Sequence, residues 1–439
     1  MKITFMGAGS TVFAKNVLGD VMLTESLRES DIALYDIDSE RLEQSYIMIT
    51  ALNRNINENK AKVSKYLGVE NRKAALKGSD FVVNAIQVGL YDPCTIIDFE
   101  VPKKYGLHQT IADSNGIGGI FRALRTIPVL KDFADDMQEV CPDAWFLNYT
   151  NPMAQLAGYM QRYTGIKTVG LCHSVQSCTR GLLENLDIDY EMPFRERIAG
   201  INHMGWLLEV YDKDGTDLYP EIRKKATEVL ESGITDHHDL VRYEYIRRFG
   251  YYCTESSEHN AEYNNFFIKS KYPELIERYN IPLDEYPRRC VSQIARWNND
   301  KQKYLHDKVS HRKTNEYASA IMDAITTDIP YKIGGNVINK GLIDNLPRET
   351  CVEVACLVNK YGIQPCIQGP LPLQLAAMNM TMINVQLLTI EAAVTRKKEY
   401  IYQAAMLDPL CSSELSIDDT IKLCDDLIET HGNWLPKYN

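Results

Sequence analysis

The sequence has few of the features that place a protein outside the ordinary globular class. None of its 11 cysteines falls in a CxxC pair, so neither a disulfide framework nor a structural zinc site is expected. Acidic residues outnumber basic ones by 59 to 48, and the formal net charge of -11 argues against general binding to nucleic acid or anionic membranes. No run reaches the ~20 apolar residues of a membrane span, and the N-terminal MKITFMGAGS lacks a secretory cleavage site. We therefore expect a cytoplasmic protein without nucleic-acid or membrane partners.

The first half of the chain alternates short apolar runs with longer amphipathic segments. The apolar runs, read as strands, lie at residues 2–6, 32–38, 80–86, 144–150 and 167–173. Helical periodicity fills most of the intervals between them. Such alternation is typical of an α/β protein, so we predict a Rossmann-like, doubly wound parallel sheet.

The pattern changes near Pro193. The segment RIAGINHMGWLLEVYDKDGTDLYP predicts two strands paired around the KDG turn. Most of the remaining chain has helical periodicity, and VEVACLVNKYGIQP indicates a short return to strand. At 439 residues the chain is long enough for two domains of ~100–200 residues. We place them at residues 1–193 and 194–439, the second of mixed α+β and mostly helical type.

A glycine-rich turn follows the first strand in FMGAGSTVF. Gly7 permits the tight turn, and Gly9 lets the backbone N–H groups next to Ser10 approach a pyrophosphate at the start of the following helix. Val12 stands where the dinucleotide fingerprint has its third glycine, so a plain tight turn remains an alternative. Asp36, at the end of the next strand, is placed to contact a ribose 2′-OH, which favours NAD over NADP; capping of the next helix is its alternative role.

Three asparagines follow other predicted strands. Asn84, Asn148 and Asn151 come at the carboxyl ends of their strands, the edge at which open α/β sheets bind ligands. Each one alone is equally consistent with a turn residue. With the glycine turn they predict dinucleotide binding, with Asn84 and Asn148 as cofactor contacts.

A thiol and two imidazoles lie near the same predicted edge. Cys172 and His173 end a strand in TVGLCHS, and His203 lies in GINHMGW. Neighbouring strand residues point to opposite faces, so Cys172 and His173 reach one site only if the chain bends between them. Cys172 and His203 form an easier pair, a two-ligand metal site with open positions. A buried thiol and a turn histidine are the alternative interpretation.

An ordered set of motifs extends along almost the whole chain. Its members are KITFMGAGS, IADSNGIGGIFRALRTIP, LNYTNPMA, VGLCHS, AGINHMGW, TESSEHNAEY and GLIDNLP followed by VEVACLVNKYGIQP. Together they resemble the NAD- and manganese-dependent glycosidases of glycoside hydrolase family 4, above all its members that hydrolyse α-galactosides. The resemblance implies a role in carbohydrate metabolism, NAD and Mn²⁺ or another divalent metal as cofactors, and a homo-oligomer (dimer or tetramer).

The resemblance also implies an unusual reaction and assigns roles to residues. The sugar is oxidised at C3 with NAD, deprotonated at C2, eliminated across C1 and C2, hydrated and reduced again. Cys172 and His203 become the metal ligands, and Asn151 and Asp113 contact the substrate, although Asp113 could instead cap a helix. His173 stands where other members carry the proposed acid, and positioning of a water is its alternative role.

The resemblance leaves several candidates for the base and bears on the charge of the substrate. The resemblance places the base near GYYCTESSEHNAEY, where the candidates are Tyr252, Glu255, Glu258 and Tyr263, with a carboxylate preferred. GLYDPCTIIDFEVPKKYG has no arginine where phospho-sugar members carry one, so a free hexoside fits better. Arg288, or its neighbour Arg289, remains a candidate substrate contact.

Other functions stay open at this point. Within the family, an α-glucosidase, an α-galacturonidase or a 6-phospho-glycosidase is the alternative. Outside it, a plain NAD-dependent hydroxyacid dehydrogenase would share the first domain, and a nucleotide-sensing binding protein would need no turnover.

Overall fold

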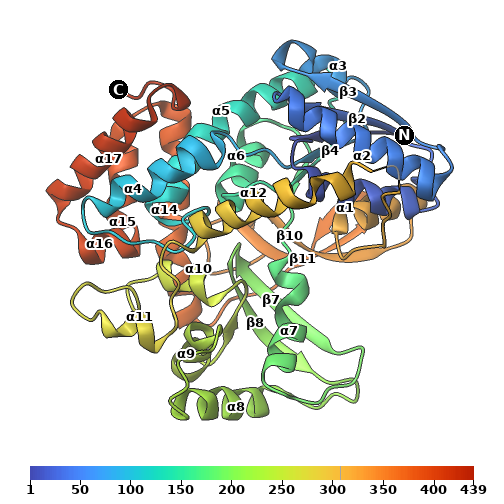
Figure 1. The fold of residues 1–439 in the computed structure, drawn as a ribbon. Helices are drawn as coiled ribbons and strands as arrows, with labels where there is room; N and C mark the ends of the chain where they lie inside the picture. The colour runs from blue at the N-terminus through green and yellow to red at the C-terminus, as the bar shows by residue number, and fades with distance from the viewer. Residues whose placement is uncertain (307) are drawn as a thin grey trace.

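The computed structural model describes residues 1–306 and 308–439 (Figure 1). Within these residues a single mixed sheet forms the centre, in the order β3-β2-β1-β4-β5-β6-β10-β11-β7-β8-β9, with β12 paired to β11. The strands are β1 (Lys2–Met6), β2 (Asp31–Asp36), β3 (Lys62–Leu67), β4 (Phe81–Asn84), β5 (Trp145–Asn148), β6 (Thr168–Gly170), β7 (Arg195–Ile201), β8 (Met204–Tyr211), β9 (Tyr252–Cys253), β10 (Tyr331–Ile338), β11 (Cys351–Asn359) and β12 (Gly362–Pro365).

Helices cover this sheet and extend beyond it. They are α1 (Thr11–Leu23), α2 (Ser39–Asn57), α3 (Arg72–Leu76), α4 (Ile96–Lys103), α5 (Gly116–Val140), α6 (Met153–Tyr163), α7 (Ser174–Asn185), α8 (Tyr219–Glu231), α9 (Leu240–Phe249), α10 (Ser257–Glu262), α11 (Glu274–Arg278), α12 (Glu285–Tyr304), α13 (Tyr317–Thr327), α14 (Leu373–Thr395), α15 (Lys398–Leu407), α16 (Pro409–Glu414) and α17 (Ile417–His431), with a π-helical turn at Leu90–Thr95 and 3₁₀ turns at Val69–Asn71 and Gly432–Trp434.

The predicted parallel sheet is confirmed. Strands β1 to β6 pair in parallel in the order 3-2-1-4-5-6, which is the doubly wound dinucleotide-binding topology. Ile3, Phe5 and Leu34 are fully buried, as expected for strands covered on both faces. Helix α1 packs against α2, while α5 packs against α3 and α6. Strand β3 was not predicted, because its residues are half-exposed at the sheet edge and have no clear apolar run.

The second half contains more strand than predicted. VEVACLVNKYGIQP forms the expected strand as the antiparallel pair β11 and β12, and β10, which was not predicted, pairs with β11 along its length. Around the predicted KDG turn the chain pairs only through an isolated antiparallel bridge between Tyr211 and Asp217. The main pairing is that of β7 with β8 around Asn202 and His203, where His203 adopts a positive φ of 61°. The KDG residues form a separate turn closed by a bond from Asp212 N to Thr216 O.

One sheet runs through both predicted domains. Asn336 of β10 pairs with Gly170 of β6, so the parallel and antiparallel halves are joined edge to edge. The division at Pro193 stays a prediction. The antiparallel strands β7 and β8, with α7, α8 and α9, form a lobe that projects from the body (Figure 1).

Helix α14 corrects the expectation that no segment matches a membrane span. By length and composition its 23 residues could cross a membrane, with a hydropathy of 1.2 in its most apolar window. In this fold 56% of that window is buried, and α14 packs against α5 and α15. Two amides on it are bonded inside the molecule, from Asn379 to Met204 O and from Gln386 to the Asn115 side chain. The helix therefore serves here as a core element.

Candidate active site

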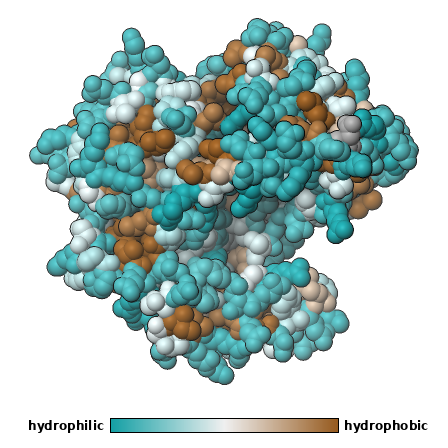
Figure 2. All heavy atoms as spheres, viewed as in Figure 1, coloured by the Kyte–Doolittle hydropathy of each residue, from teal (hydrophilic) through white to brown (hydrophobic). Residues whose placement is uncertain are grey.

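Two adjoining cavities lie at the carboxyl ends of the parallel strands. The glycine-turn cavity, ≈ 750 Å³, lies between the turn after β1, the start of α2 and helix α12. The Cys–His cavity, ≈ 490 Å³, is lined by Cys172, His173 and His203 among others. Ser10 and Gln87 line both, so the two cavities share a wall. Figure 2 shows the surface hollowed between the body and the projecting lobe.

The glycine turn packs so closely against its neighbours that neither glycine leaves room for a side chain. Gly7 has φ +84°, and a Cβ there would lie 2.8 Å from the carbonyl carbon of Ala85. A Cβ on Gly9 would lie 2.8 Å from Asp36 Oδ2. Helix α1 begins directly after Ser10, whose side chain makes no capping bond. The first N–H groups of α1 therefore remain suited to an anionic ligand.

Asp36 is used differently from the prediction. Its carboxylate accepts hydrogen bonds from Gly9 N at 2.6 Å and Asp38 N at 3.0 Å, so it fixes the turn. Asp38, which caps α2 through a bond from Arg41 N, forms the cavity wall in its place. A ribose contact by Asp36 is therefore not what this geometry favours.

Asn84 and Asn148, predicted as cofactor contacts, instead bond to other residues of the protein. Both are fully buried, and Asn84 Nδ2 donates to Asn148 Oδ1 at 2.8 Å and to Thr150 Oγ1 at 3.1 Å. Asn148 Nδ2 donates to the Thr150 carbonyl. The pair thus fixes Thr150, which lines the Cys–His cavity, instead of reaching into either cavity itself.

Cys172 and His173 both line one cavity because the chain bends after β6. His173 has helical angles of φ -74° and ψ -18° and precedes α7, so the strand alternation ends before it. Cys172 Sγ lies 3.2 Å from Ser174 Oγ. Burial raises the pKa of the Cys172 thiol, with the charges of Glu353 and Glu255 adding to the effect. Such a thiol stays protonated until a cation compensates the charge of its thiolate.

His203 brings the predicted metal pair together. It is 3% exposed, and its Nδ1 lies 3.1 Å from the Tyr263 hydroxyl. Donor atoms of Cys172, His203 and Glu255 all lie within 4.8 Å of one another, and a second such group joins His203 to Asp113 and His259. Sulfur and imidazole nitrogen, here from Cys172 and His203, suit a divalent transition metal. The donor set therefore fits the predicted cation.

Glu255 is the candidate base that the structure places in the Cys–His cavity. Its Oε2 lies 3.9 Å from His203 Nε2, and its Oε1 lies 3.4 Å from His259 Nδ1. Burial raises the pKa of Glu255, but His259 and His203 outweigh that effect and hold the pKa below its usual range. The backbone of Glu255 has φ 66°, a conformation that costs free energy in a non-glycine residue and is concentrated at functional sites. The carboxylate is thus ionised and held in place at neutral pH.

The predicted substrate contacts Asn151 and Asp113 are also brought together. Asn151 Nδ2 donates to Asp113 Oδ2 at 3.0 Å, and Arg122 Nε donates to the Asn151 carbonyl at 3.2 Å. Burial raises the pKa of Asp113, but Arg122 and His259 lower it further than burial raises it. Asp113 therefore presents a charged carboxylate to the cavity.

His173 is more accessible than the other groups. Its side chain is 52% exposed, and its Nε2 lies 2.7 Å from Glu316 Oε2. The hydrogen bond with Glu316 raises the pKa of His173 against the opposing effect of partial burial. Glu316 therefore stabilises the imidazolium form relative to an isolated histidine, and this is the form that can donate a proton.

The other base candidates are not among the residues that line the Cys–His cavity. Tyr252 belongs to β9, packs in the core at 1% exposure and donates to Asp239 Oδ2 at 2.7 Å. Glu258 is paired with Arg289. Tyr263 lies behind His203, with which it is bonded. The assignments of Tyr252 and Glu258 as catalytic groups are corrected on these contacts.

The arginine assignment shifts by one residue. Arg288 is on the outer side of α12, 55% exposed and 3.0 Å from Glu285, whereas Arg289 lines the Cys–His cavity. Helix α12 starts at Glu285, and neighbouring residues on a helix point in different directions. The sequence could not indicate which of the two faces inward.

Several cavity residues were not predicted. They are Arg122, Tyr149, His259 and Tyr286, with Glu316 behind His173. His259 follows Glu255 by four residues at the start of α10, a spacing that favours contact on a helix, and this signal could have identified it. The others come from elements distant in sequence.

Comparison with known proteins gives concordant matches. Two family profiles described as "Family 4 glycosyl hydrolase" and its C-terminal domain match residues 2–188 and 198–411. An "Alpha-galactosidase" of Bacillus subtilis is 59% identical over 100% of this chain and 99% of its own length. An "Alpha-galacturonidase" of Thermoanaerobacter italicus is 29% identical over 99% of this chain and 97% of its own length.

A solved structure shares the fold. A 6-phospho-alpha-glucosidase from gut microorganisms, in complex with NAD and Mn²⁺, superposes with a TM-score of 0.80 at 20% identity. The superposition covers 100% of this chain and 99% of the other.

Proposed function

The chain belongs to family 4 of the glycosyl hydrolases, and on this premise we propose that it is an α-galactosidase that uses NAD⁺ and a divalent metal such as Mn²⁺. The observation that supports this most strongly is the shared wall between the glycine-turn cavity and the cavity that holds Cys172, His203 and Glu255. A dinucleotide and a metal bound in these cavities would lie beside the same sugar.

The two cofactors supply chemistry that side chains lack. Bound NAD⁺ supplies reversible hydride exchange at the sugar C3, and a divalent cation supplies positive charge for the neighbouring oxygens. Gly7, Gly9 and Ser10 would contact the dinucleotide, and Cys172 with His203 would hold the metal. Because the thiol of Cys172 is protonated when no cation is bound, Cys172 releases a proton as it becomes a metal ligand.

The chain's own groups move the protons. Ionised Glu255 accepts the C2 proton at its Oε atoms once C3 is a ketone, since the adjacent carbonyl makes that proton acidic. His173, held by Glu316, donates a proton to the glycosidic oxygen as the bond to C1 breaks. Asn151 and Asp113 orient the sugar through its hydroxyl groups.

The charge of the Cys–His cavity supports a neutral sugar. Its two arginines are both engaged: Arg122 with the Asn151 carbonyl and the Tyr286 hydroxyl, and Arg289 with Glu258 and Glu285. A phosphate or a carboxylate on the sugar would need a guanidinium free for bidentate contacts. The galacto configuration is supported by the name of the relative that is 59% identical over the whole chain.

Hydrolysis of 4-nitrophenyl α-galactoside tests the proposal. After cofactors are stripped, activity should return only when NAD⁺ and Mn²⁺ are both added under reducing conditions. The α-glucoside, α-galacturonide and 6-phospho-α-galactoside should be poorer substrates. Full activity of the stripped protein would overturn the proposed reaction, and preference for a charged glycoside would overturn the substrate. Net accumulation of NADH would favour a dehydrogenase.

We also infer a cytoplasmic homo-oligomer with a cofactor domain at residues 1–193 and a substrate and oligomerisation domain at residues 194–439. The net charge and the cysteine pattern support the location. Light scattering and fractionation would test the assembly and the location.

A further inference from the structure

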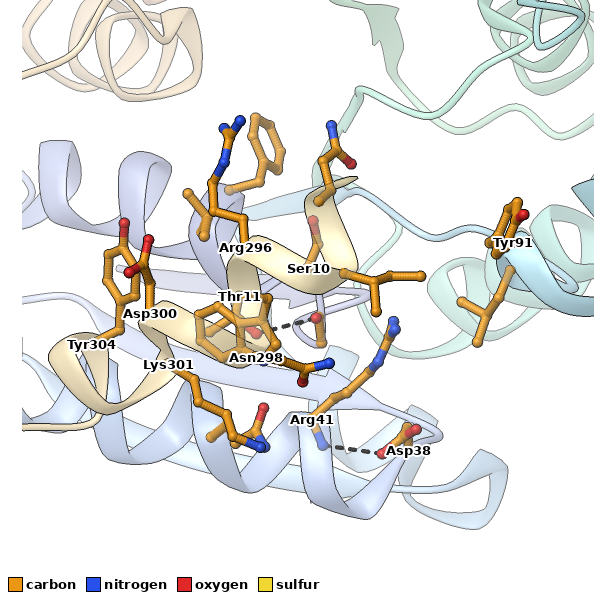
Figure 3. Close-up of a pocket in the computed structure, with 18 of the residues that line it drawn as sticks. Ser10, Thr11, Asp38, Arg41, Tyr91, Arg296, Asn298, Asp300, Lys301 and Tyr304 are labelled. Carbon is orange, nitrogen blue, oxygen red and sulfur yellow. Dashed lines mark hydrogen bonds between the residues drawn. The ribbon is translucent and has the colours of Figure 1, made fainter. Parts of the chain in front are cut away.

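Helix α12 forms one wall of the glycine-turn cavity although it belongs to the second half of the chain. The wall is made by Cys290, Gln293, Ile294, Arg296, Trp297, Asn298, Asp300, Lys301 and Tyr304. In Figure 3, Arg41 extends from α2 toward α12, and Asn298 and Lys301 extend from α12 toward α2. A ligand lying on the glycine turn would thus be enclosed between the two helices.

Both ends of α12 are attached to the dinucleotide-binding half. At its start, Asp284 N and Tyr286 N donate to the carbonyls of Gln109 and Thr110. Beyond its end, His311 Nε2 lies 2.7 Å from Asp20 Oδ1 of α1, and both groups are buried. Between these ends, Cys290 is the buried residue of the helix. Helix α12 is therefore a strap fixed at both ends and loosely packed in the middle.

The cations that face the glycine-turn cavity are available for a ligand. Arg41, Arg296 and Lys301 line it, and among the described residues none of the three forms an ion pair. In the Cys–His cavity, by contrast, Arg289 is paired with Glu258 and Glu285.

The acidic groups on the same cavity are engaged with other partners. Asp38 accepts from Arg41 N, Glu40 accepts from Gln44, and Asp300 is paired with Lys303. Arg41 and Lys301 therefore extend into the cavity from its two helices, whereas Arg296 points away from α2 (Figure 3).

Apolar and aromatic side chains complete the same wall. Val12, Leu90 and Ile294 line the cavity and are 44%, 40% and 45% exposed. Trp297 and Tyr304 of α12 stack, with ring centroids 5.7 Å apart. Phosphates, which need cations, and flat rings, which need apolar or aromatic surface, are the two parts of a dinucleotide.

We propose that α12 is a strap that closes over the bound dinucleotide, and that Arg41 and Lys301, which extend into the cavity from its two helices, bind its phosphates. This inference rests on the proposed use of NAD⁺. It assigns part of the cofactor site to the second half of the chain and links cofactor retention to a helix that also contributes Tyr286 and Arg289 to the Cys–His cavity.

Binding of NAD⁺ to the full-length enzyme, measured by calorimetry, tests the proposal without turnover. Arg41→Ala and Lys301→Ala should each raise the Kd roughly tenfold, the loss expected for an exposed charge-assisted contact to phosphate. Lys303→Ala is the matched control, because Lys303 lies on the same helix and pairs with Asp300; its Kd should stay within about twofold of wild type.

Two results separate this inference from the function on which it rests. If the wild-type protein binds NAD⁺ and both variants bind it equally well, the strap is refuted and the proposed function stands. If the wild-type protein binds no NAD⁺, both fail.

Limited trypsin digestion gives a second readout. Arg296 and Lys303 are exposed in this structure, and NAD⁺ should slow cleavage at both, because α12 must unfold locally to enter a protease. Cleavage in α12 at an unchanged rate with saturating NAD⁺ would overturn the closure.

Discussion

The two adjoining cavities differ in how their side chains are held. In the Cys–His cavity, Asp113, His203 and His259 are buried and bonded to one another or to close neighbours. In the glycine-turn cavity, Arg41 extends from α2 and Lys301 from the loosely packed α12, both without ion-pair partners among the described residues. The first arrangement is preorganised for chemistry, whereas the second provides affinity and can open. Substitutions should therefore damage rate in one cavity and binding in the other.

Among the substitutions considered, that of the metal ligand Cys172 is expected to reduce activity most. Cys172→Ser should reduce kcat/KM by more than ~100-fold, beyond what loss of an outer-shell partner costs, and should weaken Mn²⁺ binding. The exposed Cys366 offers a control, since Cys366→Ser should leave both quantities unchanged. Steady-state kinetics and a Mn²⁺ titration followed by electron paramagnetic resonance would measure them. Equal Mn²⁺ affinity in wild type and Cys172→Ser would remove Cys172 from the metal site.

The proposed base comes next. Glu255→Gln should lower kcat by about 10²–10⁴-fold, the usual contribution of a positioned acid or base, with little change in the Kd for NAD⁺. Tyr252→Phe is the comparison in the same segment, because the Tyr252 hydroxyl is bonded to buried Asp239. That variant should keep its rate and lose about 1 kcal/mol of stability. A Tyr252→Phe enzyme as slow as Glu255→Gln would reverse the assignment.

Substitution of Glu316, the partner of His173, is expected to have a smaller effect, confined to the pH dependence of the rate. Glu316 raises the pKa of His173, so Glu316→Gln should lower that pKa. Because the acid must be protonated, the alkaline limb of the kcat profile should move to lower pH, while the plateau at low pH changes little. An unmoved alkaline limb would show that His173 is not the acid.

The smallest effect is expected outside both cavities, at Asp408. Burial raises the pKa of Asp408 to about 6, above its value in an unfolded chain, so the folded state favours the protonated form. Its stabilising contribution is present below pH ~4 and is lost as the pH rises through 6. Asp408→Asn should therefore raise the melting temperature relative to wild type at pH 7.5 and not at pH 4, with activity unchanged. A difference that grows toward low pH would contradict the sign.

The sequence identified the parts of the site that depend on local chain geometry. Gly7 and Gly9 follow a strand and Cys172 stands at a strand end, so short motifs predict where they lie; the hairpin turn that holds His203 was predicted at KDG instead. The ordered set of motifs added the chemistry. These residues came together as expected at one edge of the sheet.

The incorrect predictions concern residues whose side-chain direction depends on tertiary packing. Tyr252 pairs through β9 with β8 and therefore faces the core, and Arg288 faces outward where Arg289 faces inward. Asp36 has the expected position, but its carboxylate accepts a hydrogen bond from Gly9 N in the glycine turn. The wall formed by α12 depends on a helix crossing back over the first half, which no local pattern encodes.

The central claim is that a C2–H bond of the sugar breaks during each turnover. Hydrolysis of an α-galactoside in D₂O, with NAD⁺ and Mn²⁺ present, tests it by nuclear magnetic resonance of the released sugar. Glu255 is partly exposed at the cavity surface, so its proton exchanges with solvent, and galactose should carry deuterium at C2. Galactose that retains hydrogen at C2 after complete hydrolysis would contradict the account.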